Sequence, residues 1–138
     1  MERIADWPMS GNRGGIVYRI LGIGELLWDM LPEGPQLGGA PANYSVMAAR
    51  LGDDAAILSR IGDDELGSRA REVLRPFPVD CYHLQEDADQ STGRVTVSFE
   101  DGQPSYTIHQ PVAWDFFALS EDWPVSYTHL TLPTNREV

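Results

Sequence analysis

Two polar side chains in the first third of the chain have the chemistry to bind a polyhydroxylated molecule. Asp29 stands five residues after Gly24, which closes a nearly continuous apolar run. A carboxylate accepts hydrogen bonds from two or more hydroxyl groups, and Asn43 offers both an acceptor and a donor. The Asp29 carboxylate can equally well cap a turn, so its position alone leaves a ligand role and a structural role open.

A pair of adjacent glycines, Gly38 and Gly39, stands between these two side chains. Glycines let bare backbone approach a ligand and permit a hinge, although a flexible connection before an ordinary helix is the alternative. A dinucleotide site is not indicated, because Leu27 occupies the place of the third glycine after Gly22-Ile-Gly24. Those two glycines are explained instead by a strand end that passes close to a neighbouring backbone.

Alternating strand and helix signals predict a parallel sheet that would position these residues. Apolar runs predict buried strands at 16–24, 55–61 and 79–84. Helices are predicted from Pro41 to Gly52, and from the acidic residues 63–65 to Pro76. Open α/β sheets bind ligands beyond the carboxyl ends of their strands. We therefore expect Asp29 and Asn43 to converge near that edge.

The remaining segments carry weaker or different signals. Residues 25–39 are rich in glycine and proline and predict a loop, and the acidic residues 86–89 predict a solvated loop. Two alternating runs, 94–100 and 104–110, flank Asp101-Gly102 and predict a β-hairpin. A weak helical pattern follows at 113–119.

Composition narrows the classes of function. The 138 residues carry a formal net charge of −11, which disfavours binding to nucleic acid or to an anionic membrane surface. All ten basic residues are arginines, so the sequence supplies no phosphate-loop, Schiff-base or general-base lysine. A single cysteine, no membrane-length apolar run and no signal core lead us to expect a cytoplasmic protein. His83 and His129 lack partners at metal-ligand spacing, so no metal site is predicted.

Several motifs together resemble the ribokinase/fructokinase-like (PfkB) carbohydrate kinases. The resemblance rests on Gly24-Glu-Leu-Leu-Trp-Asp29, Gly38-Gly-Ala-Pro-Ala-Asn-Tyr-Ser45 and Arg60-Ile-Gly-Asp-Asp64. Ser91-Thr-Gly93 before the hairpin is similar to the family's lid, and Val112-Ala-Trp-Asp115 to its fructokinase-like branch. The similar region runs from about residue 17 to residue 120. The fold that it implies is α/β: the N-terminal half of a ribokinase-like fold, a parallel sheet with crossover helices plus a small β lid hairpin.

The resemblance also implies a function and its site residues. Such enzymes transfer the γ-phosphoryl group of ATP, with Mg²⁺, to a sugar hydroxyl. The aspartate and asparagine that correspond to Asp29 and Asn43 hold sugar hydroxyls, and the glycines that correspond to Gly38 and Gly39 lie at the sugar site and hinge the lid. His109 and Gln110 at the end of the second lid strand either touch the sugar or are simply exposed. A homodimer formed through the lid is a further expectation.

Two parts of the family pattern have no counterpart here. The family's catalytic aspartate lies in a Gly-Ala-Gly-Asp anion-hole motif in its C-terminal half, together with the nucleotide site, and no such motif occurs in this sequence. Residues 125–138 resemble the in-frame translation of a transposon end used to build sequencing libraries. We therefore expect a disordered lead-in at 1–15, a partial kinase domain at 16–124 with lid strands at about 93–110, and a non-native tail at 125–138.

The expected function is thus the sugar-binding half of a fructokinase-type enzyme, inactive alone and without a bound cofactor of its own. Two alternatives stay open. The first is a non-catalytic module for sugar binding or lid-mediated dimerisation, and the second is a nucleoside-type kinase of the same superfamily.

Overall fold

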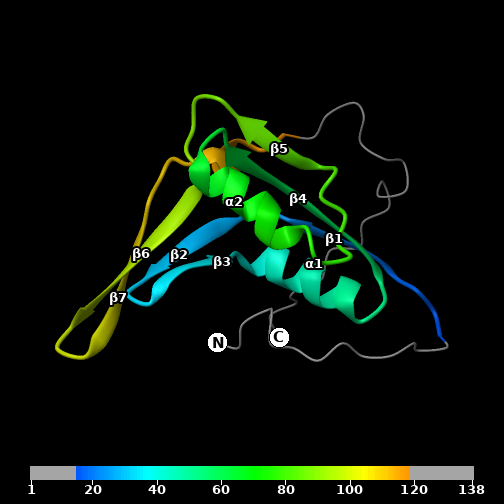
Figure 1. Cartoon of the computed structure of the whole chain (residues 1–138), viewed down its shortest axis with the longest axis horizontal. Coiled ribbons are helices and arrows are strands. Elements are labelled where there is room, and N and C mark those ends of the chain that lie inside the picture. Colours follow the sequence, from blue (N-terminus) through cyan, green and yellow to red (C-terminus); the bar gives the residue numbers. More distant parts are fainter. Residues whose placement is uncertain (1–14, 119–138) are drawn as a thin grey trace, which may run out of the picture.

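A three-stranded parallel sheet forms the larger part of the structure. The computed structural model describes residues 15–118. The strand order is β1-β4-β5, with bounds Arg19–Ile23, Asp54–Gly62 and Leu84–Asp87. The central strand β4 is buried on both faces from Ala55 to Ser59, as its continuous apolar run predicts. The predicted parallel sheet is confirmed (Figure 1).

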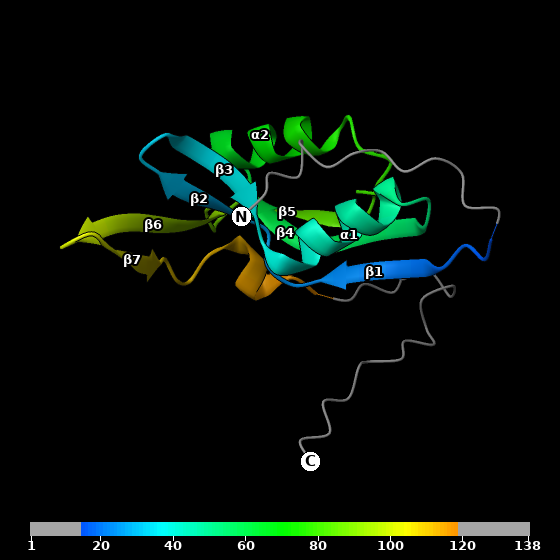
Figure 2. The same cartoon turned by 90° about the horizontal axis from the view of Figure 1, so that it is seen from below.

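Both helices lie on one face of this sheet, and a short 3-10 helix, η2 (Ala113–Phe116), lies on the other (Figure 2). Helix α1 (Ala40–Arg50) has a proline in its first turn and ends before Gly52, as predicted. Helix α2 (Glu65–Leu74) is capped by Asp64, whose Oδ1 accepts a hydrogen bond from the Gly67 N–H at 2.8 Å. The weak helical signal at 113–119 corresponds only to η2.

A second sheet projects away from the first (Figures 1 and 2). We call it the lid sheet; its order is β3-β2-β6-β7, with bounds Gly34–Gly38, Leu27–Leu31, Gly93–Glu100 and Gln103–Ile108. Strands β6 and β7 pair antiparallel around Asp101 and Gly102, which confirms the predicted hairpin. Strand β2 pairs with β6 in parallel and with β3 antiparallel.

The loop prediction for residues 25–39 is wrong, because this segment forms β2 and β3. Pro35 was interpreted as a loop signal, but β3 is an edge strand, where a residue without an N–H is tolerated. The strand prediction at 79–84 is also wrong. Asp80 forms a single bridge with Ala56, its carboxylate then accepts the Tyr82 N–H at 2.8 Å in a turn, and the strand begins only at Leu84.

The core joins the two sheets. Leu26, Trp28, Val46, Ile57 and Ile61 are at most 1% exposed and belong to one apolar cluster. Trp28 lies on lid strand β2, yet its indole N–H donates to the Leu66 carbonyl of α2 at 3.0 Å. The base of the lid sheet is therefore part of the main core.

Two predicted segments fall largely beyond the described part. The lead-in predicted at 1–15 lies outside it except for Gly15, and the tail predicted at 125–138 lies wholly outside it. Among the described helices, none is long and apolar enough to span a bilayer.

Candidate functional site

A groove of about 810 Å³ opens between the lid sheet and the start of α1. Its apolar wall comes from the lid, and its polar groups come from both sides of the opening. The lining residues are Glu25, Leu27, Asp29, Leu31, Glu33, Gln36, Gly39, Ala40, Asn43, Val95, Val97, Tyr106 and Ile108. Such a mixture of apolar surface and a few polar groups is typical of small-molecule sites.

Asp29 reaches the groove from the middle of β2. Its neighbours across the lid sheet are Gln36 on β3 and Val95 on β6, so the strand pairing fixes its position. Burial, and to a smaller extent the nearby carboxylate of Glu25, raise the pKa of Asp29 above its ordinary value. In the described structure, the Asp29 carboxylate therefore lacks the hydrogen-bond donors that would stabilise its charged form.

The glycine pair allows the chain to pass this carboxylate. A Cβ at Gly38 would lie 2.9 Å from Asp29 Oδ2. Gly39 has φ +107°, and a Cβ there would lie 2.4 Å from the Glu25 carbonyl oxygen. Only glycine fits this backbone and this close approach. Gly39 lines the groove directly, whereas Gly38 is buried behind Asp29.

Asn43 faces the groove from the first turn of α1. Its backbone N–H donates to the Gly39 carbonyl at 2.9 Å. Its side-chain Oδ1 is fully buried and accepts no hydrogen bond in the described structure. Buried acceptors are nearly always paired, so this oxygen keeps an unused acceptor beside the groove.

Sequence reasoning missed Glu25, which it placed in a loop. Its Oε1 accepts the Ala40 N–H at 3.2 Å, which ties the chain entering the lid to the start of α1. His109 contacts Thr96 Oγ1 through Nε2 at 2.8 Å, and neither His109 nor Gln110 lines the groove. Asp29, Gly39 and Asn43 therefore share one groove, with Gly38 directly behind it.

These groups can bind and orient hydroxyls, but they do not form a metal centre. Among residues 15–118, no three His, Cys, Asp or Glu side chains are arranged to hold a metal ion.

Replacing Asp29 with asparagine is expected to raise the melting temperature at neutral pH. Because the folded state raises the pKa of Asp29, the charged form is disfavoured there, and the cost appears as pH rises through that pKa. The gain should shrink below about pH 4, where the carboxyl is protonated in both states. Thermal unfolding against pH, with Asp101→Asn in the exposed hairpin turn as control, measures it. A gain that does not vary with pH contradicts this origin.

Comparison with known proteins identifies the family of this chain. Residues 35–130, most of the chain, match the pfkB family carbohydrate kinases. The chain belongs to the PfkB family. It is 36% identical to the fructokinase of Klebsiella pneumoniae over 108 residues, which cover 74% of this chain and 35% of that protein. It is 32% identical over 108 residues to the aminoimidazole riboside kinase of Salmonella typhimurium, with coverage of 74% and 34%.

Solved structures of the PfkB family show the same fold. The fructokinase from Vibrio cholerae O395 in apo form matches with a TM-score of 0.68 and 34% identity, over 72% of this chain and 37% of that one. A second structure of that enzyme holds fructose, ADP and a calcium ion. The α/β architecture of the matched region agrees with a ribokinase-like fold. This chain spans about a third of the length of these relatives.

Proposed function

We propose that this chain forms the acceptor-sugar side of a carbohydrate kinase of the fructokinase type. The Asn43 amide carries the proposal most directly. It lines the groove, and its Oδ1 lacks a donor in the described structure, which a sugar hydroxyl supplies when the amide turns toward it. The Asp29 carboxylate lies in the same groove and has the same need for donors. Neutral polyols supply several hydroxyls at the spacing of one ring or short chain.

Each residue then has a defined part in binding. Asp29 and Asn43 accept hydroxyl hydrogen bonds, and the apolar lid side chains Val95 and Val97 cover the carbon face of the sugar. Gly38 and Gly39 bring bare backbone to the sugar and serve as the hinge of the lid. Fixing the acceptor in this way lowers the entropic cost of phosphoryl transfer, because the attacking hydroxyl is already oriented.

The proposal for this chain covers the sugar acceptor and does not include the phosphoryl donor. ATP, with a divalent ion, supplies the transferred group in such enzymes, and the Vibrio cholerae fructokinase has been solved with ADP and calcium. The sequence contains no Gly-Ala-Gly-Asp anion-hole motif, which carries the catalytic aspartate in the family that it resembles. We therefore propose that the 138-residue chain does not transfer phosphate by itself.

Fructose titrated into the 15N-labelled chain is expected to shift the amide signals of the groove residues. Asp29→Asn should weaken binding at least about tenfold, since a hydrogen bond to a charged acceptor is worth roughly 1.5–3 kcal/mol. Asp101→Asn, the same change in the exposed hairpin turn, should leave the affinity unchanged. If fructose, ribose and a ribonucleoside all leave the groove signals unmoved, the acceptor-site proposal is wrong.

The same samples test the alternatives. Turnover in a coupled ADP-release assay that Asp29→Asn abolishes would show that these residues suffice for catalysis. Tighter binding of a ribonucleoside than of fructose would favour the nucleoside-type kinase, which the similarity to aminoimidazole riboside kinase supports.

A homodimer through the lid is supported by exposed Phe99, Tyr106 and Ile108 on β6 and β7, which are 59–63% exposed.

A further inference from the structure

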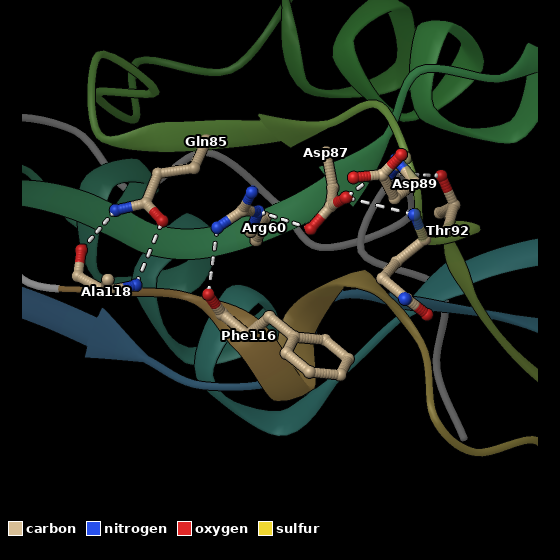
Figure 3. A network of polar contacts seen from close by, with 9 residues as sticks. Arg60, Gln85, Asp87, Asp89, Thr92, Phe116 and Ala118 are labelled. Carbon is tan, nitrogen blue, oxygen red and sulfur yellow. Dashed lines mark hydrogen bonds and ion pairs between the residues drawn. The ribbon is translucent and has the colours of Figure 1, made fainter.

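The lid sheet is joined to the parallel sheet by four chain crossings, and the two pairs are built differently. The crossings at 24–26 and 38–39 border the groove and contain Gly24 and Gly39, both with positive φ. The crossings at 88–92 and 109–112 pass the carboxyl ends of β4 and β5 instead, where polar contacts are dense (Figure 3).

Arg60 on β4 contacts residues that flank both crossings of this second pair, Asp87 just before 88–92 and Phe116 after 109–112. Its Nη1 donates to the Phe116 carbonyl at 3.0 Å and so holds the chain that leaves the lid. Its Nε lies 2.8 Å from Asp87 Oδ2. The Nε–H is not aligned for a hydrogen bond, so this contact is an ion pair. Figure 3 shows the guanidinium between these two partners.

Asp87 extends the contact to the chain that enters the lid. Its Oδ1 accepts the backbone N–H groups of Asp89 and Gln90, both at 2.9 Å. The side chain is only 7% exposed, so the prediction that 86–89 form a solvated loop is wrong for Asp87. Arg60 supplies the charge that makes this burial tolerable.

Two further contacts hold Thr92 in the crossing that enters the lid and Ala118 in the chain that follows the other crossing. Gln85 on β5 makes a two-way amide pair with the backbone of Ala118, in which its Oε1 accepts the Ala118 N–H at 3.0 Å. Asp64 accepts the Thr92 N–H at 2.8 Å and the Thr92 hydroxyl at 2.7 Å, and Thr92 is fully buried one residue before β6. Burial alone would raise the pKa of Asp64, but the Thr92 and Gly67 hydrogen bonds lower it below its ordinary value.

We propose that Arg60 is a positioning residue for the acceptor groove, which it serves by fixing the lid sheet against the carboxyl ends of β4 and β5. This inference rests on the proposed function of the groove. Asp29 comes from the lid and Asn43 from α1, so the angle of the lid sets the separation of the two acceptors. Trp28 anchors the base of the lid to α2, and Arg60 controls the far pair of crossings.

A guanidinium suits this task better than an ammonium. It presents several N–H donors in fixed directions, so one side chain reaches Asp87 and the Phe116 carbonyl together. Lysine would keep the charge beside Asp87 but would not hold both partners in the same plane. Arg60→Lys therefore separates the positioning role from the simple neutralisation of a buried acid.

The test is a distance distribution between spin labels at Ser105 of the lid and Ser68 of α2, both exposed, introduced as Ser105→Cys and Ser68→Cys in a Cys81→Ala background. We expect a narrow distribution for the parent and clearly broader ones for Arg60→Gln and Arg60→Lys. Arg19→Gln removes an exposed ion pair with Asp54 at the other end of β4 and should leave the distribution narrow. Folded Arg60→Lys with a distribution as narrow as the parent's overturns the proposal.

Fructose titration adds a second readout. If Arg60→Lys lowers to a tenth the fraction of molecules whose lid sheet has the position described here, the apparent Kd rises about tenfold, because affinity scales with the competent fraction. Arg60→Gln/Asp87→Asn removes both charges and keeps the test valid if Arg60→Gln alone fails to fold. Absence of fructose binding in the parent would refute the acceptor site and leave the label distances to decide the role of Arg60. A lower melting temperature with unchanged distances and affinity would make Arg60 purely structural.

Discussion

Gly22→Ala is expected to destabilise the chain by about 3 kcal/mol, the upper end of the cost of overpacking a core. A Cβ at this position would lie 2.2 Å from Ser45 Oγ and 2.3 Å from the Pro41 carbonyl oxygen. Neither neighbour can retreat easily, because the first turn of α1 is seated on β1 at this point and Ser45 is fully buried. Chemical denaturation monitored by tryptophan fluorescence gives the change in the free energy of unfolding.

Gly102→Ala is the matched control. Gly102 has a positive φ but open space around its Cβ position, so its substitution should cost only about 1 kcal/mol of backbone strain. Equal losses for the two variants would show that backbone freedom, and not the contact between β1 and α1, explains Gly22.

Trp28→Ala is expected to cost about 3–5 kcal/mol, as large-to-small changes of buried aromatic residues do. Trp28 is 1% exposed, Arg69 stacks over its ring at 4.9 Å, and its indole N–H binds the Leu66 carbonyl. The loss would be a large fraction of the roughly 5–15 kcal/mol by which domains are usually stable. Thermal and denaturant unfolding measure it.

Two other variants divide this effect into its parts. Trp28→Phe keeps an aromatic ring but removes the indole N–H that donates to the Leu66 carbonyl, which should cost about 1 kcal/mol. Phe99→Ala removes a 59% exposed aromatic side chain from the same sheet and should change stability by no more than about 0.5 kcal/mol. A Trp28→Ala loss as small as that of Phe99→Ala would mean that the lid is not anchored at Trp28.

Local patterns predicted the elements whose signals are local. The apolar run of β4, the proline and glycine that bound α1, and the Asp101-Gly102 turn each identify their own element. Strand β3 was not predicted, because its proline and glycines are disfavoured in strands generally but tolerated at an edge. Whether a strand lies at an edge depends on its partners, which no short window of sequence contains.

The candidate site, like the fold, could be predicted from the sequence only in part. Asp29 and Asn43 were expected to converge, and both line the groove. Glu25 was missed because its contact with Ala40 depends on two segments meeting. The buried Asp87 was missed for the same reason: its acidic neighbours suggest solvent, and only the tertiary fold brings Arg60 to it.

Strand β7 has a consequence for the behaviour of the protein in solution. It is the outer strand of the lid sheet, every residue from Gln103 to Ile108 is exposed, and none of the six is charged. An uncharged edge strand is a template for intermolecular β-pairing and aggregation. The net charge of −11 opposes such contacts only at long range, and salt at about 0.15 M screens charges beyond about 8 Å. The protein should therefore stay dispersed in dilute buffer and become prone to edge-to-edge aggregation as ionic strength rises.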